Sequence, residues 1–263
     1  MDAPRFHREA TPGRGPCAFL LHGMLSSHLQ WRPNLPALSR HLRPVSFELW
    51  GHGNSPTPLD DAPYTVPAIV EQLENVRQEF GAAHLVLIGQ SFSAGLVLRY
   101  ALEHPERVLA VVFTNSASAL SDVHDARVRA RQQRMIDVVA AGGAQAVRQL
   151  PMHPRGGRRL PPELKPALVA AADAVDPQAI ERLARVTGPG LSVARDLPRL
   201  ACPVLVVNGR HEAAFQPWRD LAVRTIPHCE VVDVDAGHAV NLEAPDVFDA
   251  AVMEFVQRHA AHV

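Results

Sequence analysis

The chain has 263 residues, of which 47% are hydrophobic and 20% charged, with a net charge of −1. These values indicate a globular protein with one large core, and they argue against nucleic acid or an acidic membrane surface as a partner. No apolar run approaches the roughly 18 residues of a membrane span. Three widely spaced cysteines form no disulfide framework, and no secretory signal is visible, so we expect a cytoplasmic protein with reduced thiols.

The first firm strand is predicted over residues 17–21, after a polar segment with room for at most one short strand. It runs into a loop at residues 22–24. A second strand over residues 44–49 leads to a glycine-rich turn that contains His52 and Ser55. Glycines suit the positive φ angles of a tight turn. We expect His52 and Ser55 to hold this turn by local hydrogen bonds and to take no part in chemistry.

The turn after the third predicted strand is the most informative one in the chain. Apolar residues at helical spacing first predict a helix over residues 65–80. An apolar strand over residues 85–88 follows and ends at Gly89. An apolar helix follows over residues 92–104, with Ser91 between strand and helix. Such a turn exposes the serine hydroxyl at the carboxyl end of a sheet, where the backbone N–H groups of the helix favour negative charge.

Further strands alternate with helices along most of the chain. Buried strands are predicted over residues 108–113, 203–208 and 231–234, and a closing amphipathic helix over residues 247–259. Strands and helices that alternate at this spacing predict a doubly wound, mostly parallel sheet with helices on both faces. The fold class is therefore α/β.

The alternation stops between residues 116 and 200, where no strong strand is predicted. Helical patterns over residues 135–141 and 166–175 are broken by glycines and prolines. We therefore divide the chain into a core, residues 1–115 and 201–263, and an inserted helical segment, residues 116–200.

Arginine is dense in the first half of this inserted segment. One interpretation is a solvated helix face followed by a basic loop. The other is that one or two of these side chains face inward and hold a carboxylate or a phosphate of a substrate. The residues are Arg127, Arg129, Arg131, Arg134, Arg148, Arg155, Arg158 and Arg159.

Residues 89–93, Gly-Gln-Ser-Phe-Ser, resemble the nucleophile elbow of the α/β-hydrolases, G-x-S-x-G, with Ser93 in place of the second glycine. The His-Gly pair in the loop at residues 22–24 and the glycine-rich turn with His52 also match this family. The resemblance covers nearly the whole chain outside the inserted segment and the first 16 residues. It implies an α/β-hydrolase fold, in which the inserted segment would form a helical cap over the active site.

The resemblance also implies a triad in the order serine, acid, histidine. Ser91 would be the nucleophile. Glu212 follows the strand at residues 203–208, where the family usually carries the acid, typically Asp, and His238 follows the last strand, where it carries the base. Some members carry the acid after the preceding strand, and Asp122 is the first carboxylate available there.

The resemblance also implies an oxyanion hole, which binds the negative oxygen of a tetrahedral intermediate and would be formed by the backbone N–H groups of Met24 and Phe92. His22 and Gln90 are candidates for binding the substrate. Met135 is a further candidate because apolar residues of the inserted segment could line a pocket, although their helical spacing also suits packing in the core. The chain has no His-Glu-x-x-His run, no cysteine pair at zinc spacing and no dinucleotide or phosphate loop, so we expect neither a metal nor a cofactor.

These residue types suit acyl transfer. A serine hydroxyl needs a base to become a nucleophile, imidazole can take up and return a proton, and a carboxylate orients the imidazole. We expect a serine hydrolase acting on a carboxylic ester or thioester of a small-to-medium apolar acyl substrate, free or linked to a carrier. The alternatives are lyase or carbon–carbon bond chemistry with the same triad, and ligand binding without catalysis.

Overall fold

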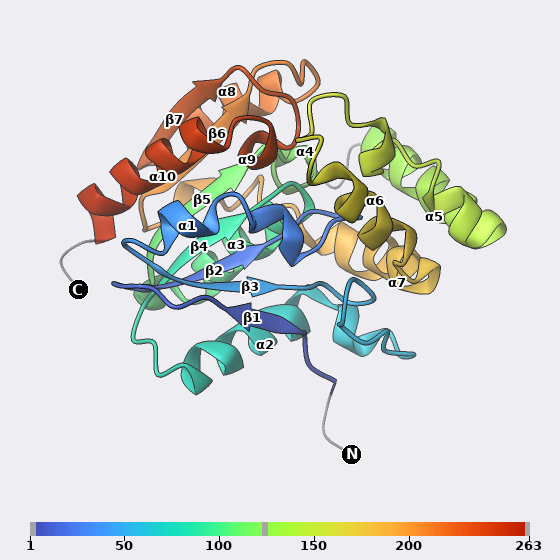
Figure 1. Cartoon of the computed structure of the whole chain (residues 1–263), viewed down its shortest axis with the longest axis horizontal. Helices are drawn as coiled ribbons and strands as arrows, with labels where there is room; N and C mark the ends of the chain where they lie inside the picture. Colours follow the sequence, from blue (N-terminus) through green and yellow to red (C-terminus); the bar gives the residue numbers. More distant parts are fainter. Residues whose placement is uncertain (1–3, 123–125, 261–263) are drawn as a thin grey trace.

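The computed structural model describes residues 4–122 and 126–260, and the strands of these residues form one seven-stranded sheet (Figure 1). The order across the sheet is β1-β3-β2-β4-β5-β6-β7, and every neighbouring pair is parallel except β1 with β3. This confirms the predicted α/β fold class. The strands are β1 (Arg8–Ala10), β2 (Cys17–Leu21), β3 (Arg43–Phe47), β4 (Leu85–Gly89), β5 (Val108–Thr114), β6 (Val204–Gly209) and β7 (Cys229–Val234).

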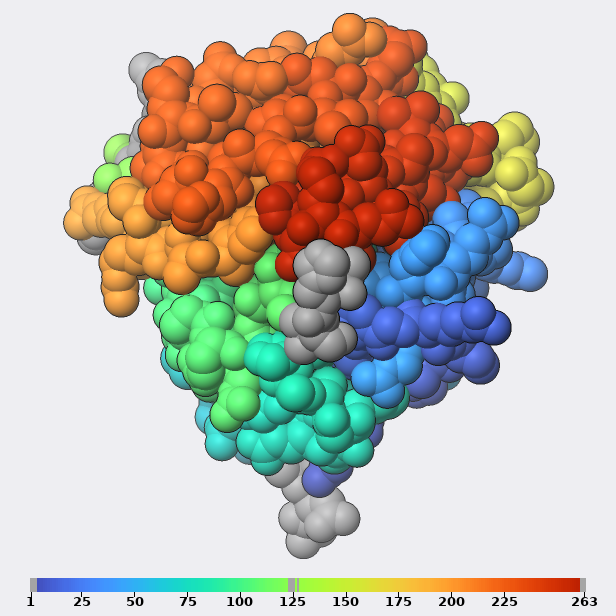
Figure 2. Space-filling view, turned by 90° about the vertical axis from the view of Figure 1, so that its left-hand side faces the viewer, coloured from blue at the N-terminus to red at the C-terminus, as the bar shows by residue number. Residues whose placement is uncertain are grey.

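Helices cover both faces of this sheet, and the cluster of buried residues on each face shows which helices pack there. One cluster joins α2, α3 and α8 to the sheet, and the other joins α1 and α10. In Figure 2 the dark red atoms of α10 lie above the teal atoms of α2, with green and blue parts of the chain between them. The helices outside the inserted segment are α1 (Leu35–Leu38), α2 (Val66–Glu79), α3 (Phe92–Glu103), α8 (Gln216–Thr225), α9 (Val240–Glu243) and α10 (Pro245–Ala260).

The central strands feed both clusters because successive side chains of a strand point to opposite faces. In β4, Leu85 and Leu87 belong to the cluster under α2 and α3, whereas Val86 and Ile88 belong to the cluster under α10. This double burial explains why the strands are continuous apolar runs in the sequence.

The predicted strands, and the predicted helices over residues 65–80, 92–104 and 247–259, end within two residues of the observed elements. Thr65, predicted as the first residue of a helix, instead caps α2, and its hydroxyl accepts a hydrogen bond from Ala68 N. The short first strand is present as β1, three residues long and antiparallel to β3. A helical stretch is expected from the sequence through Trp31 and Leu38, and the structure has a 3-10 turn at His28–Trp31 and helix α1 there. Helix α8 was not predicted. Among residues 4–122 and 126–260, no helix combines the length and apolar character needed to span a membrane.

The inserted segment lies between β5 and β6, and its described residues, 116–122 and 126–200, contain helices and turns but no strand. Its helix α5 is longer than the predicted 135–141 and is interrupted at Gly143, where φ is +50° and ψ is −136°. Helix α7 was not predicted. Figure 1 shows α5, α6 and α7 gathered at one end of the sheet. The helices are α4 (Ala117–Leu120), α5 (Ala126–Val147), α6 (Lys165–Asp173) and α7 (Pro177–Arg182).

A small hydrophobic cluster joins this segment to the core. It contains Val139 of α5 and Ile180 of α7 together with Leu25, which belongs to the loop after β2. The neighbouring Met24 and the α5 residue Met135 pack against it. The inserted segment therefore contacts the core at the loop in which the sequence places an oxyanion hole.

Candidate active site

Ser91 occupies a strained turn between β4 and α3. Its φ is +52° and its ψ is −112°, a combination that is unfavourable for any residue with a Cβ atom. The turn is tight because α3 packs closely on the strand: a Cβ atom added at Gly89 would lie 2.7 Å from the carbonyl oxygen of Ser93. The backbone thus presents the half-buried Ser91 side chain at the carboxyl end of the sheet.

Ser93 is the departure from the family pattern, and the structure gives it a role. It is fully buried, and its hydroxyl donates a hydrogen bond of 2.5 Å to the carbonyl oxygen of His22. A glycine could not make this bond. Ser93 therefore ties the serine turn to the loop after β2.

Ser91, His238 and Glu212 come together in one chain of hydrogen bonds. The His238 Nε2 atom lies 2.8 Å from Ser91 Oγ, and its Nδ1 atom lies 2.8 Å from Glu212 Oε2. Because a carboxylate only accepts hydrogen bonds, Nδ1 carries the proton in the neutral ring, and Nε2 is free to accept the proton of the serine hydroxyl. Three residues from the ends of three different strands thus form the arrangement of a nucleophile, a base and an orienting acid.

The Glu212 carboxylate is held by a second partner, Asn115, which directly follows β5. The Asn115 side chain is 1% exposed, and its Nδ2 atom donates 2.8 Å to Glu212 Oε2 and 3.1 Å to Gly209 O. Its Oδ1 atom accepts a 2.9 Å bond from Gly209 N. The only hint in the sequence that Asn115 holds the acid is its position directly after β5, where some α/β-hydrolases carry the acid itself.

The surroundings keep Glu212 ionised. Burial by itself would raise the pKa of this carboxyl group. The hydrogen bond and charge of His238, the hydrogen bond from Asn115 and the charge of Arg131 outweigh burial, so the pKa lies below its ordinary value. An ionised acid at this position holds the His238 ring and stabilises its protonated form.

Two further side chains fix the His238 loop. Glu243 of α9 accepts hydrogen bonds from the backbone N–H groups on both sides of the histidine, 2.6 Å from Gly237 and 3.2 Å from Ala239. Gln90 donates a 3.3 Å bond to the carbonyl oxygen of His238. Glu243 was not among the residues singled out from the sequence. Gln90, expected to bind substrate, is 5% exposed and instead positions the base.

The loop after β2 lies directly against the nucleophile. A Cβ atom added at Gly23 would come within 1.9 Å of Gln90 Oε1 and 3.3 Å of Ser91 Cβ, so only glycine fits there. The same loop is fixed from its other side by Gln30, whose Oε1 atom accepts a 3.3 Å bond from Gly23 N. The backbone of this loop, which includes Met24 N, therefore runs beside Ser91.

Two buried histidines hold this loop to the turn after β3. His22 donates from Nδ1 to Gly23 O at 2.7 Å and accepts at Nε2 from Leu49 N at 3.1 Å. His52 accepts at Nε2 from Leu25 N at 3.1 Å. Burial lowers the pKa of His52 to about 4 and that of His22 well below its usual range, so both rings are neutral acceptors near pH 7.

This geometry corrects the expectation that His22 binds substrate, because its ring is fully buried and both nitrogens bond to the backbone. The expected local bonds of the glycine-rich turn are present: Ser55 Oγ donates 2.6 Å to Glu48 O, and His52 Nδ1 donates 2.9 Å to Trp50 O. His52 also reaches the loop after β2, which was not foreseen.

Asp122, the alternative acid, lies outside this arrangement. Its carboxylate pairs with Arg195 at 3.2 Å, and its side chain is 48% exposed. The position that the acid would take after β5 is filled by Asn115. Within the described part of the chain, no group of three or more His, Cys, Asp or Glu side chains is arranged to hold a metal ion.

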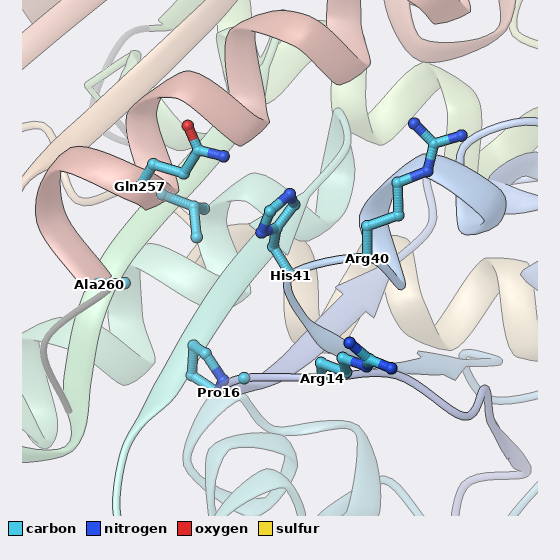
Figure 3. Close-up of a pocket in the computed structure, with 8 residues that line it drawn as sticks. Arg14, Pro16, Arg40, His41, Gln257 and Ala260 are labelled. Atoms are coloured by element: carbon cyan, nitrogen blue, oxygen red, sulfur yellow. The ribbon is translucent and has the colours of Figure 1, made fainter.

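A cavity of about 220 Å³ lies far from the triad, between the loop before β2, the residues after α1 and the end of α10 (Figure 3). Figure 1 shows this end of α10 opposite the end that carries α5. The triad itself is open to solvent, since the side chains of His238 and Glu212 are 43% and 30% exposed. A substrate can therefore reach Ser91 without passing through an enclosed tunnel.

Comparison with known proteins agrees with this geometry. A family model described as the alpha/beta hydrolase fold matches residues 19–245. Carboxylesterase YbfK of Bacillus subtilis is 26% identical over 249 residues, which is 93% of this chain and 81% of that protein. Two solved structures share the fold. A thermophilic esterase from Thermogutta terrifontis has a TM-score of 0.80 and 22% identity, covering 96% of this chain and 93% of that one.

The other solved structure is MenH from S. aureus, with a TM-score of 0.84 and 18% identity, covering 96% of this chain and 98% of that one. The matched range of the family model includes the positions of Ser91, Glu212 and His238. The chain is thus an enzyme that belongs to the alpha/beta hydrolase fold family.

Proposed function

We propose that this enzyme is a serine hydrolase that cleaves carboxylic esters or thioesters through an acyl-Ser91 intermediate. The observation that carries the proposal is the unbroken chain of two 2.8 Å contacts from Ser91 Oγ through the His238 ring to Glu212. Such a chain activates a serine hydroxyl, which by itself is a weak nucleophile. The similarity to a protein named carboxylesterase over 93% of the chain supports the same chemistry.

In the acylation step, Ser91 Oγ attacks the carbonyl carbon of the substrate, and its proton passes to His238 Nε2. The tetrahedral intermediate then collapses, the bond to the alcohol or thiol breaks, and His238 returns the proton to the leaving group. In the second half, His238 takes a proton from water, the resulting hydroxide attacks the acyl group, and Ser91 recovers its proton. Glu212 stays ionised throughout and stabilises the charged His238 ring.

The backbone N–H groups of Met24 and Phe92 are the proposed donors to the oxyanion. Phe92 is the first residue of α3, directly after the nucleophile, and the loop of Met24 runs beside Ser91. Across residues 4–122 and 126–260, neither N–H group is hydrogen-bonded to another part of the protein. Each such donor contributes about 3–4 kcal/mol to transition-state stabilisation in comparable sites.

An apolar acyl group fits the side chains near this loop. Met24 and Met135 are partly exposed and pack on the hydrophobic cluster that contains Leu25. Methionine side chains adapt to differently shaped apolar partners. We therefore propose small-to-medium acyl chains as substrates, with Met135 as a contact residue on α5.

A serine-directed fluorophosphonate tests the nucleophile, and mass spectrometry locates the adduct. We expect labelling at Ser91 in the intact protein and its loss in Ser91→Ala and in His238→Ala. Rapid acid quenching during turnover of a p-nitrophenyl ester should trap an acyl group on Ser91.

Several results would contradict this proposal. Full esterase activity in the Ser91→Ala variant would exclude the acyl-enzyme route. Labelling of Ser91 without turnover of any ester or thioester would favour lyase or carbon–carbon bond chemistry with the same triad. Absence of both labelling and turnover in folded protein would favour ligand binding without catalysis.

A further inference from the structure

The inserted segment differs in charge from the rest of the chain. Residues 116–200 contain 13 Arg and Lys against 8 Asp and Glu, whereas the remaining residues contain 13 against 19. The helices of this segment contact the loop beside the nucleophile. An excess of positive charge thus lies at the end of the sheet that carries the triad.

Most arginines of the segment whose side chains the structure describes are neutralised by a carboxylate. Asp173 pairs with two of them, Asp61 with two more, and Asp122 and Asp196 with one each. These pairs tie the segment to itself or to the core. The paired arginines are Arg148, Arg155, Arg182, Arg185, Arg195 and Arg199.

Arg131 on α5 is different. Its side chain is exposed, and within residues 4–122 and 126–260 it forms neither a hydrogen bond nor an ion pair. Its guanidinium group is therefore available to a ligand. A free guanidinium presents a planar set of donors that matches a carboxylate or a phosphate.

The packing of α5 places Arg131 near the triad. Met135 lies one turn after Arg131 and packs against the hydrophobic cluster that contains Val139 and Leu25, the latter in the loop beside Ser91. Gln132, the next residue, donates a hydrogen bond to the carbonyl oxygen of Ala184, which fixes the rotation of the helix. Arg131 therefore lies at the edge of the face that α5 turns to this loop.

An electrostatic effect on the triad agrees with this placement. The charge of Arg131 is among the influences that lower the pKa of Glu212, so the guanidinium group lies within electrostatic reach of the triad acid. The site is also open, because the His238 side chain is 43% exposed. In an open site, a fixed charge at the entrance contributes strongly to which substrates are bound.

We propose that Arg131 binds a carboxylate or phosphate group carried by the substrate, so that the enzyme selects esters or thioesters with an anionic group in addition to the scissile bond. This inference rests on the proposed hydrolase function and adds a substrate class to it. Arg131 acts in binding and not in bond cleavage. Its charge is the last of the influences that lower the pKa of Glu212, after those of His238 and Asn115, so its removal should leave the reaction of neutral esters nearly unchanged.

The test compares three p-nitrophenyl esters with acyl chains of similar length: a neutral chain, a chain that ends in a carboxylate and a chain that ends in a phosphate monoester. Arg131→Met removes the charge but keeps an unbranched side chain. Arg134→Met is the matched control, because Arg134 is also exposed, unpaired within the described residues and on α5.

We expect Arg131→Met to lower kcat/KM for one or both anionic esters by about 10- to 100-fold, mainly through KM, as for the loss of a hydrogen bond to a charged group. The neutral ester should change by less than about 2-fold, and Arg134→Met should affect none of the three. A larger loss for the phosphate than for the carboxylate, or the reverse, identifies which anion the site takes.

Equal effects of Arg131→Met on neutral and anionic esters, or no effect on either, would overturn the inference while leaving the hydrolase proposal in place. If the intact enzyme hydrolyses no ester and the fluorophosphonate does not label Ser91, the proposed function fails and the inference fails with it. Labelling of Ser91 separates these two cases.

Discussion

The catalytic end of the core and the inserted segment are held in place by different forces. In the core, Asn115, Gln90 and Glu243 hold Glu212 and the His238 loop through partly buried hydrogen bonds. The inserted segment is attached mainly by apolar packing, since its buried residues Leu183 and Leu191 belong to the main core cluster, and it adds exposed ion pairs such as that between Asp61 and Arg185. Buried polar bonds are costly to break, whereas an exposed ion pair contributes about 0–1 kcal/mol.

This difference explains how chemistry and selectivity are separated in the molecule. The triad needs positions accurate to a few tenths of an ångström, and buried hydrogen bonds provide that accuracy. The inserted segment needs only to place apolar and charged side chains at the entrance. We therefore expect substitutions in the core site to have large effects on activity and substitutions of the exposed ion pairs to have small ones.

The largest effect is expected for Glu212→Gln. The change keeps the size of the side chain but removes the charge that holds the protonated His238 ring, so kcat should fall by about 100- to 10,000-fold. The fall is measured with a neutral p-nitrophenyl ester, with circular dichroism to show that the variant folds. Loss of less than 3-fold would mean that another carboxylate serves as the acid, and Asp122→Asn would then be the next variant.

A smaller effect is expected for Asn115→Ala. The variant removes one hydrogen bond to Glu212 and leaves the buried Gly209 N–H without a partner. We expect a loss of about 1–3 kcal/mol in the free energy of unfolding and a fall of about 10-fold in kcat/KM. Urea denaturation and ester hydrolysis measure the two quantities. Unchanged activity would show that Glu212 keeps its position without Asn115.

A pH-dependent effect is expected from Asp249 of α10, which belongs to the buried polar groups of the core. Burial, with a smaller contribution from the charge of Asp246, raises the pKa of this carboxyl group to about 7. The hydrogen bond from Asn34 lowers the pKa but does not offset burial. Between pH 4 and 7 the unfolded chain has lost this proton and the folded chain still holds it. Stability must therefore fall as pH rises through this range, and the loss is complete above pH 7.

The Asp249→Asn variant should not show this loss of stability, because asparagine does not titrate. The free energy of unfolding of the variant minus that of the unaltered protein should increase by about 1–3 kcal/mol between pH 5 and pH 8. Urea denaturation at the two pH values measures it, and the contributions of other titrating groups cancel in the difference. A difference that does not change with pH would contradict the assignment.

The smallest effect is expected for Arg185→Gln in the inserted segment. This arginine makes two 2.8 Å hydrogen bonds to Asp61, but both side chains are about half exposed. We expect a loss of no more than about 1 kcal/mol in stability, smaller still at 1 M salt, and activity within about 2-fold. A loss of stability as large as that expected for Asn115→Ala would show that the inserted segment depends on the Arg185–Asp61 pair. The core site and the inserted segment would then not differ in the way proposed.

Much of the core could be predicted because its signals are local. Apolar runs such as residues 85–88 predict buried strands, and the order of the loops after them places Ser91, Glu212 and His238 at one edge of a sheet. The structure brings these three side chains together. The extent of the helices in the inserted segment was harder to predict. The apolar pattern indicates a helix only over residues 135–141, whereas α5 is longer and packs through Val139 in the cluster that contains Leu25.

The partners of these residues could not be predicted, because they are distant in the sequence. Asn115 and Glu212 are 97 positions apart and meet because β5 and β6 pair in a register that aligns Thr114 with Val207. No local pattern indicates that His22 and His52 are buried.

Residues close together in the chain predict the alternation of strands and helices and the turn that exposes Ser91, and the resemblance to the α/β-hydrolases supplies the order of acid and base. Only the folded chain reveals that His22 and Gln90 support the site, that Asn115 lies beside Glu212 and that Arg131 forms no ion pair within the described residues. Burial and hydrogen-bond partners depend on strand register and helix packing, which no local pattern encodes.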